Sequence, residues 1–227
     1  MSSIDSGTFS SVEEETRMSS PPDSTVFVVD DDPDIRTSFR WLIESVGLRV
    51  ETYESADAFL EAYSPDVPGC LVLDVRMPGM SGLDLLDALR QRAIEIPVTI
   101  ITAYGDVQKA VRAMKNGAID FIEKPIGDQT LLDRIHQSLD SDRKRREELA
   151  EIREIEARID LLTPREQQVM KLVVKGLSSK EAGEEFEISF KTVEAHRAKI
   201  MSKMQAKSVP HLINQCVTAR WNAGNDT

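Results

Sequence analysis

Five short apolar runs alternate with amphipathic stretches through the first part of this sequence, and this alternation constrains the fold more than any other feature. The amphipathic stretches carry apolar residues at helical spacing, and the short runs have the length of buried strands. Units that alternate in this way predict an α/β fold, with a parallel sheet, right-handed crossovers and helices on both faces. The predicted strands cover residues 25–29, 48–53, 70–73, 98–101 and 119–122, and the predicted helices cover residues 34–46, 55–63, 82–93, 106–116 and a segment that begins near Asp128.

Acidic residues follow two of these runs. Asp30, Asp31 and Asp32 come directly after the first run, and Asp74 comes after the third. A parallel sheet brings the residues at its strand ends to one crevice, where crowded carboxylates repel unless a pKa rises or a cation binds. Because Mg²⁺ prefers oxygen ligands, a Mg²⁺ site is one prediction for this crevice. If Asp30, Asp31 and Asp32 are considered alone, a solvated acidic loop is the alternative to a metal site.

Thr102 closes the fourth run and Lys124 follows the fifth, so a hydroxyl and an ammonium join the acids at the same edge. Taken singly, the first is a common turn residue and the second a common surface lysine. Together the four groups suit phosphoryl chemistry, in which a carboxylate attacks phosphorus while cations and a hydroxyl bind its oxygens. Asp74 is the predicted nucleophile, because the Pro- and Gly-bearing loop after it leaves its carboxylate accessible.

The net charge of −11 conceals two regions of opposite charge. From Asp160 onward the chain has 10 Lys and Arg against 8 Asp and Glu, a net charge of +2, and the remainder has 18 against 31, a net charge of −13. An evenly acidic chain would argue against nucleic-acid binding, whereas a basic C-terminal part permits it.

The C-terminal part has a purely helical pattern with a short turn between its second and third helices, which predicts a helix-turn-helix. Thr163, Pro164 and Glu166 have the pattern of a helix start. The third helix is basic, with Val193, Ile200 and Met204 on its core-facing side, as a major-groove reader requires. If only the charge of this helix is considered, an ordinary solvated helix is the alternative interpretation. The predicted helices cover residues 164–175, 179–186, 190–204 and 210–222.

The remaining segments are predicted from composition. Residues 1–23 form a disordered tail rich in Ser, Glu and Pro, residues 143–159 a charged, semi-rigid helical linker, and residues 223–227 a second tail. The linker continues a helix, or two nearly continuous helices, from near Asp128. With no signal peptide and no apolar stretch of membrane-spanning length, we expect a cytoplasmic protein without membrane contact. Cys70 and Cys216 are expected to be reduced core residues.

The segments VFVVDDDPDIR, LVLDVRMPGMSG, TIITAYGD and GAIDFIEKPI resemble the signature blocks of response-regulator receiver domains over residues 24–142. The resemblance implies a flavodoxin-like, five-stranded receiver domain that a sensor histidine kinase phosphorylates with Mg²⁺. It leaves the role of Asp32 open, between a solvated position and an effect on the metal, and it implies a cis peptide before Pro125. The implied roles are phosphoacceptor for Asp74, metal ligands for Asp30, Asp31, Asp74 and the Arg76 carbonyl, phosphate sensor for Thr102, phosphate-binding cation for Lys124 and switch aromatic for Phe121.

The segments LTPREQQVMKLVVKGLSSKE and EISFKTVEAHRAKI resemble the LuxR-type helix-turn-helix, over residues 160–222. The combination is similar to the FixJ/NarL class of transcription factors. It implies binding to double-stranded DNA after phosphorylation, through release of the DNA-binding domain or through homodimerisation by the face around residues 106–140, with RNA polymerase as a further partner. In the second helix Gly183 replaces a more usual Ala, at a cost of roughly 1 kcal/mol. The implied DNA contacts are Lys191, Thr192, Glu194, His196, Arg197, Lys199 and Lys203, with a structural role as the alternative for His196.

Two other functions are consistent with an acidic crevice. An aspartate-nucleophile phosphatase also uses a Mg²⁺-bound carboxylate. Enzymes of that class have a DxDx[TV] motif at their first strand, whereas the predicted nucleophile here follows the third predicted strand. A non-enzymatic interaction module with a vestigial pocket would not need the complete set of two acids, Thr and Lys. A phosphorylation-controlled transcription regulator, rather than an enzyme with a substrate of its own, is therefore the main prediction.

Overall fold

The computed structural model describes residues 24–103 and 107–221, so both predicted tails, residues 1–23 and 223–227, lie outside the described residues. The chain divides into two compact units, Met1–Lys144 and Arg145–Thr227. Within the described ranges, no helix is both long and apolar enough to cross a membrane.

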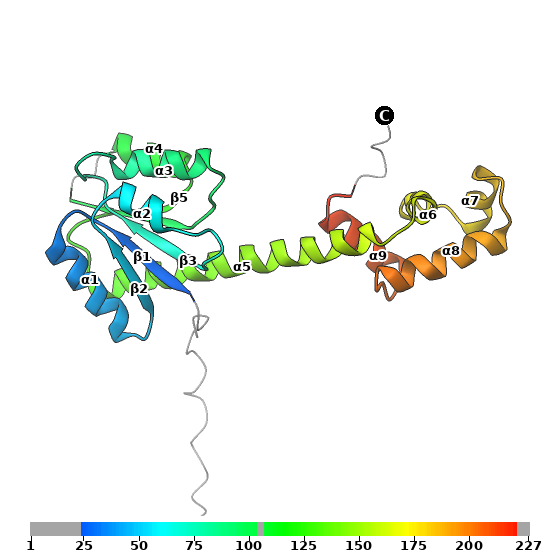
Figure 1. The fold of residues 1–227 in the computed structure, drawn as a ribbon, viewed down its shortest axis with the longest axis horizontal. Helices are drawn as coiled ribbons and strands as arrows, with labels where there is room; N and C mark the ends of the chain where they lie inside the picture. Colours follow the sequence, from blue (N-terminus) through cyan, green and yellow to red (C-terminus); the bar gives the residue numbers. More distant parts are fainter. Residues whose placement is uncertain (1–23, 104–106, 222–227) are drawn as a thin grey trace, which may run out of the picture. The chain divides into compact units, whose positions relative to one another are not determined.

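The N-terminal unit contains a five-stranded, all-parallel sheet in the order β2-β1-β3-β4-β5 (Figure 1). The predicted α/β fold is therefore confirmed. The strand order reverses between β1 and β3, and doubly wound sheets place their crevice at this point. The strands are β1 Thr25–Val29, β2 Arg49–Tyr53, β3 Gly69–Leu73, β4 Val98–Thr102 and β5 Ala118–Glu123, and the helices between them are α1 Pro33–Ser45, α2 Ala56–Ala62, α3 Gly82–Gln91 and α4 Val107–Lys115.

Alternate side chains of β1 enter two separate cores, one on each face of the sheet. Phe27 and Val29 pack with residues of α2, α3 and α4, whereas Val26 and Val28 pack with residues of α1 and of α5 (Asp128–Asp160), the helix that follows β5. This alternation follows from the two-residue period of a strand. Because both faces are covered, the central strands are continuous apolar runs in the sequence.

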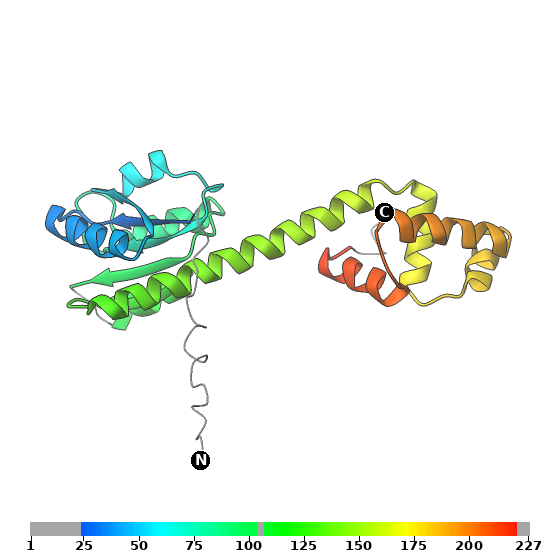
Figure 2. The same ribbon diagram turned by 90° about the horizontal axis from the view of Figure 1, so that it is seen from below.

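Helix α5 is a single helix, Asp128–Asp160, so the first of the two predicted alternatives, one helix rather than two nearly continuous ones, is confirmed (Figure 2). In the N-terminal unit, its apolar residues Leu131, Ile135 and Leu139 are buried against the sheet. Further along, the Asp142 carboxylate accepts a hydrogen bond from the Gly69 amide at 2.9 Å, which holds the helix at the start of β3.

The C-terminal unit is the predicted small helical domain, and each of its helices begins at a Ser or Thr N-cap. The capping box of Thr163 and Glu166 confirms the predicted helix start. Ile155 and Ile159 of α5 are buried in this unit's core, so the end of the predicted linker is part of the packing. The helices are α6 Pro164–Val174, α7 Ser179–Glu185, α8 Phe190–Lys203 and α9 Val209–Thr218.

Candidate functional site

The predicted crevice lies at the carboxyl ends of four parallel strands. Asp30 follows β1, Asp74 follows β3, Thr102 ends β4 and Lys124 follows β5. The sheet itself places two of these residues: the Asp74 amide donates to the Val29 carbonyl at 2.9 Å, and the Lys124 amide donates to the Thr102 carbonyl at 2.8 Å. Four chain segments far apart in the sequence thus meet at one edge.

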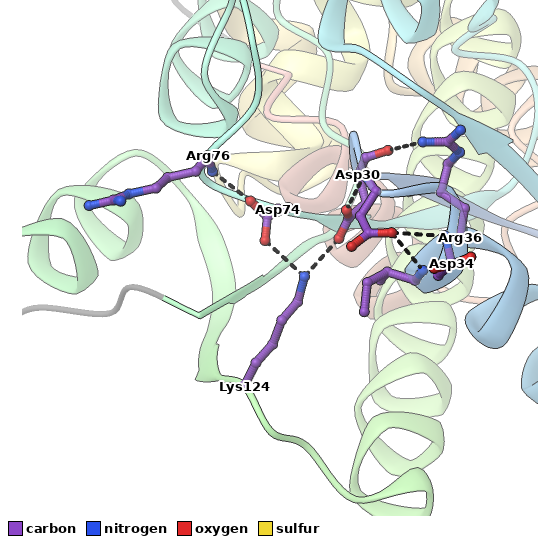
Figure 3. Close-up of polar contacts among 8 residues, drawn as sticks. Asp30, Asp34, Arg36, Asp74, Arg76 and Lys124 are labelled. Atoms are coloured by element: carbon purple, nitrogen blue, oxygen red, sulfur yellow. Dashed lines mark hydrogen bonds and ion pairs between the residues drawn. The ribbon is translucent and has the colours of Figure 1, made fainter.

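The Lys124 ammonium lies between two buried carboxylates (Figure 3). Its Nζ donates to Asp30 Oδ2 at 2.7 Å and to Asp74 Oδ1 at 3.0 Å. Asp30 is 4% exposed and Asp74 is 8% exposed. The second oxygen of Asp74, Oδ2, accepts the Arg76 amide at 2.6 Å. One cation is therefore shared by two carboxylates, and the three groups carry excess negative charge.

Burial raises the pKa of Asp74 above its usual value, although the hydrogen bond and charge of Lys124 and the Arg76 amide act in the opposite direction. The charge of Asp30 raises the pKa of Asp74 further. Burial also disfavours the ammonium form of Lys124, but the hydrogen bonds and charges of both carboxylates outweigh it and raise the pKa of Lys124. The lysine therefore stays charged, whereas the negative charge of Asp74, the nucleophile candidate, is disfavoured by burial.

The three consecutive acids have different surroundings. Asp30 points into the crevice and also accepts the Asp32 amide on Oδ1 at 2.9 Å. Asp31 is exposed. Asp32 is the N-cap of α1: its carboxylate accepts the amides of Asp34 at 2.8 Å and Ile35 at 3.4 Å. The role of Asp32, left open by the sequence, is thus to start the helix that follows the acidic loop.

The donor chemistry of this crevice fits Mg²⁺, because the side chains that face one another offer only carboxylate oxygens to a cation. In residues 24–103 and 107–221, no group of three or more His, Cys, Asp and Glu side chains is close enough to hold a metal by itself. Water and a main-chain carbonyl would have to complete the coordination, as Mg²⁺ usually requires.

Thr102 and Phe121, the predicted sensor and switch residues, lie on neighbouring strands β4 and β5. Thr102 is fully buried. Phe121 is partly buried and packs against the core that contains α2, α3 and α4. The peptide between Lys124 and Pro125 is cis, as the receiver resemblance implies.

Two residues that the sequence did not single out fix the main chain of the crevice. The Arg36 guanidinium donates to the Asp30 carbonyl at 2.7 Å (Figure 3). A Cβ on Gly82 would lie 2.0 Å from the Asp74 carbonyl oxygen, so only glycine lets α3 start against the nucleophile candidate. Gly82 directly follows the segment VRMPGMS, so its place in the sequence could have indicated a close approach of the main chain to Asp74. No local sequence pattern indicates that Arg36 binds the Asp30 carbonyl.

Helix α8, the predicted DNA reader, has the expected division into two sides. Val193, Ile200 and Met204 are buried in the core of the C-terminal unit. Lys191 and Lys199 are exposed. The helix therefore combines a core-facing apolar side with exposed cations.

The other predicted DNA contacts are partly engaged within the unit. Glu194 accepts a hydrogen bond from Ser179 of α7 and lies 3.8 Å from Arg197 Nε. The Thr192 hydroxyl lies 2.8 Å from that of the N-cap Ser189.

His196 and Lys203 are engaged differently. Among the described residues, the buried Nδ1 of His196 has no hydrogen-bond partner. The Lys203 ammonium donates to Glu166 at 2.6 Å and to the Leu161 carbonyl at 3.0 Å.

Comparison with known families assigns each unit separately. Residues 26–136 match the response regulator receiver domain, and residues 160–215 match the luxR family of bacterial regulatory proteins. Receiver domains generally use Mg²⁺ for phosphorylation.

Similar proteins and structures cover most of the chain. Nodulation protein W of Bradyrhizobium diazoefficiens is 46% identical over 85% of this chain and 85% of its own length. The transcriptional regulatory protein FixJ of Rhizobium meliloti is 43% identical over 86% of this chain and 96% of its own. A solved structure of the response regulator StyR has 44% identity and a TM-score of 0.79, over 86% of this chain and 98% of that one. Full-length FixJ from B. japonicum has 39% identity and a TM-score of 0.53, over 87% and 98% of the two chains.

Since these similarities extend across both units, the chain belongs to the FixJ-like response regulators, which join a receiver domain to a LuxR-type helix-turn-helix domain.

Proposed function

We propose that this protein is a transcription regulator whose DNA binding is controlled by phosphorylation of Asp74 by a sensor histidine kinase. The observation that carries the proposal is the Lys124 ammonium between the buried carboxylates of Asp30 and Asp74, at 2.7 and 3.0 Å. The family consists of transcription regulators, not classical enzymes. The receiver domain would catalyse only its own phosphorylation and dephosphorylation.

In the proposed reaction, an oxygen of Asp74 forms a bond to phosphorus while the bond from phosphorus to the kinase's histidine nitrogen breaks, and the electron pair of that bond stays on the nitrogen. Lys124 and the Thr102 hydroxyl would bind phosphoryl oxygens as these gain charge. The groups proposed to hold Mg²⁺ are Asp30, Asp31, Asp74 and the Arg76 carbonyl. The charge of the bound ion would neutralise the phosphoryl oxygens.

The proposed switch is a movement of Thr102 to the phosphoryl group, with Phe121 turning inward and α4 changing position. Helix α4 suits such a movement, because Ala113 is its one buried residue among those described. Polar contacts between exposed side chains tie it to α3, including Arg112 with Asp87 at 2.5 Å.

The α4–β5 face is the proposed homodimer contact of the phosphorylated receiver. Its exposed apolar side chains support this use, because such patches are usually covered by a partner. They are Val107, Val111 and Met114 of α4 and Ile119 of β5.

The proposed output is binding of double-stranded DNA by α8, with RNA polymerase as a further partner. Exposed Lys191 and Lys199 would supply charge for DNA phosphates, with α8 lying in the major groove. Thr192, Glu194, His196 and Arg197 remain proposed contacts near the same surface.

The phosphorylation step is tested by incubating the full chain with acetyl phosphate and Mg²⁺ and locating the acyl phosphate by mass spectrometry. We expect one phosphoryl group per chain, on the peptide that contains Asp74. The Asp74→Asn variant should take up none, and the control Asp84→Asn, at an exposed acid of α3, should behave as wild type. A phosphoryl group elsewhere would contradict the proposal. Steady release of phosphate from esters, far beyond one equivalent, would indicate a phosphatase instead.

A further inference from the structure

Lys203 lies at the end of the DNA-reading helix α8, but its ammonium is directed into its own domain. Its Nζ donates to Glu166 Oε2 at 2.6 Å and to the Leu161 carbonyl at 3.0 Å. These two partners flank the turn between α5 and α6, and Glu166 is 37 positions away from Lys203 in the sequence. One side chain thus joins the end of α8 to α6 and to the residue that follows α5.

The carboxylate of Glu166 is a built acceptor site. Its side chain is 4% exposed. Besides the Lys203 ammonium, Oε2 accepts the amide of Thr163 at 2.9 Å, and the Glu166 amide in turn donates to the Thr163 hydroxyl at 3.3 Å. A buried carboxylate is tolerated when it is paired and hydrogen-bonded, and removal of its cation leaves an uncompensated charge.

The same contact connects the linker helix to α8. Leu161 directly follows α5, and Ile155 and Ile159 of α5 are buried in the same core as Val193 and Ile200 of α8. The apolar core fixes the distance between the two helices. The ammonium adds a directional contact at the C-terminal end of α8, where an apolar core alone permits rotation and sliding.

We propose that Lys203 is a positioning residue for DNA recognition, which holds α8 against the end of the linker helix and the start of α6, and that it does not contact a DNA phosphate. The proposal rests on the DNA binding proposed above. A phosphate contact by Lys203 would require the ammonium to leave a buried carboxylate unpaired, whereas Lys199 reaches solvent on the same helix without such a cost.

The test compares Lys203→Met with Glu166→Gln and the double variant in the full-length protein. The probe is a fluorescent duplex selected from a random pool by the phosphorylated wild type, titrated at several salt concentrations. If Lys203 positions α8, each single variant should weaken binding about five- to tenfold, and the double variant no further, since all three lose the same contact. The slope of log affinity against log salt should stay at the wild-type value, because no phosphate contact is lost.

Two further variants serve as controls. Lys199→Met should lower the salt slope by about 1, as expected for a lost phosphate contact. Lys203→Arg retains a cation that can pair with Glu166 and should restore most of the affinity. The Trp41→Phe background, which removes an exposed indole of the receiver, leaves Trp221 as the reporter that the C-terminal unit is folded.

The proposal is overturned if Lys203→Met lowers the salt slope by about 1 while Glu166→Gln binds DNA as well as the wild type or more tightly. If the wild type binds no DNA, the proposed function fails, but the contact itself is still tested by unfolding. Non-additive shifts of the urea midpoint in the two single variants and the double variant would support it. Additive shifts would contradict it.

Discussion

Lysine–carboxylate clusters occur in both units of this molecule, and their surroundings differ. In the receiver, Lys124 is shared between the buried carboxylates of Asp30 and Asp74, and burial raises the pKa of Asp74. In the DNA-binding unit, Lys203 pairs with the single carboxylate of Glu166. The hydrogen bond from Lys203, together with those of the helix start, lowers the pKa of Glu166 to about 2.

The difference shows that the balance of donors to carboxylates decides whether such a cluster is reactive or structural. Two carboxylates with one ammonium retain negative charge and basic oxygens, which suit a metal ion and an incoming phosphoryl group. A single carboxylate with an ammonium and a helix-start amide is satisfied, and it stabilises the helices that it joins. The first arrangement supports chemistry, and the second supports recognition by fixing geometry.

The largest expected effect follows from removal of the receiver's lysine. Lys124→Met should lower the rate of phosphorylation by acetyl phosphate about 100-fold, because the cation that binds the phosphoryl oxygens is lost. Lys203→Met should leave this rate unchanged. The rates are measured from the accumulation of phosphorylated chain; a loss below about threefold in Lys124→Met would remove the lysine from the proposed mechanism.

The same carboxylate-to-amide change should have opposite effects on stability in the two units. Asp74→Asn relieves a buried, crowded charge and should raise the free energy of unfolding of the receiver by about 1 kcal/mol. Glu166→Gln weakens a buried ion pair and should lower that of the DNA-binding unit by roughly 1–3 kcal/mol. Urea unfolding without Mg²⁺, followed by far-UV circular dichroism and by Trp221, measures both. Changes of the same sign in the two free energies of unfolding would contradict the proposed difference between the two clusters.

Acidification should separate the two clusters as well. The pKa of Glu166 is depressed when folded, so its stabilisation is complete above its ordinary pKa of 4.5 and is lost as the pH falls toward about 2. The pKa of Asp74 is raised, so its contribution changes in the opposite sense and stability falls as the pH rises through the range of Asp titration. In the Trp41→Phe background, urea unfolding followed by Trp221 should show that the wild-type sequence at Glu166 loses more free energy of unfolding than Glu166→Gln as the pH falls from 4.5 toward about 2, because the variant lacks the titrating carboxylate. Identical profiles would contradict this assignment.

The smallest expected effect is at a glycine. Gly183 in α7 costs helix propensity, but a Cβ there would lie 2.9 Å from the Ile188 carbonyl oxygen in the turn before α8. We expect Gly183→Ala to destabilise the protein by about 1 kcal/mol or less, because the gain of roughly 1 kcal/mol in propensity offsets part of the clash. Gly127→Ala is a comparison without a clash, because a Cβ there would meet nothing within 4 Å, but Gly127 precedes α5 and gains no helix propensity. A clear gain in urea midpoint for Gly183→Ala would show that the turn adjusts freely.

Much of the receiver site could be predicted from the sequence, because its residues stand at the ends of apolar runs and a parallel sheet has one carboxyl edge. Asp74 and Lys124 are 50 positions apart, yet their strand-end positions alone place them together. The role of Asp32 was left open between a solvated position and an effect on the metal, whereas in the structure its carboxylate caps α1. The partner of Arg36 is a main-chain carbonyl, which no sequence pattern indicates.

The DNA-binding unit was less predictable in detail. A basic helix after a short turn is a local pattern, so the division of α8 into a core side and an exposed side follows from its period. The pairing of Lys203 with Glu166 is non-local, and a lysine at the end of a basic helix gives no sign of turning inward. In the same way, Ile155 and Ile159 continue a helical pattern that does not say which core they enter.

The central claim, that phosphorylation of Asp74 controls DNA binding, is tested most directly by titrating a selected operator duplex with full-length protein, before and after treatment with acetyl phosphate and Mg²⁺. Treated wild type should bind at least about fivefold more tightly than untreated protein, as expected for a coupling of 1 kcal/mol or more, and Asp74→Asn should not respond. Equal affinity of treated wild type and treated Asp74→Asn would contradict the account.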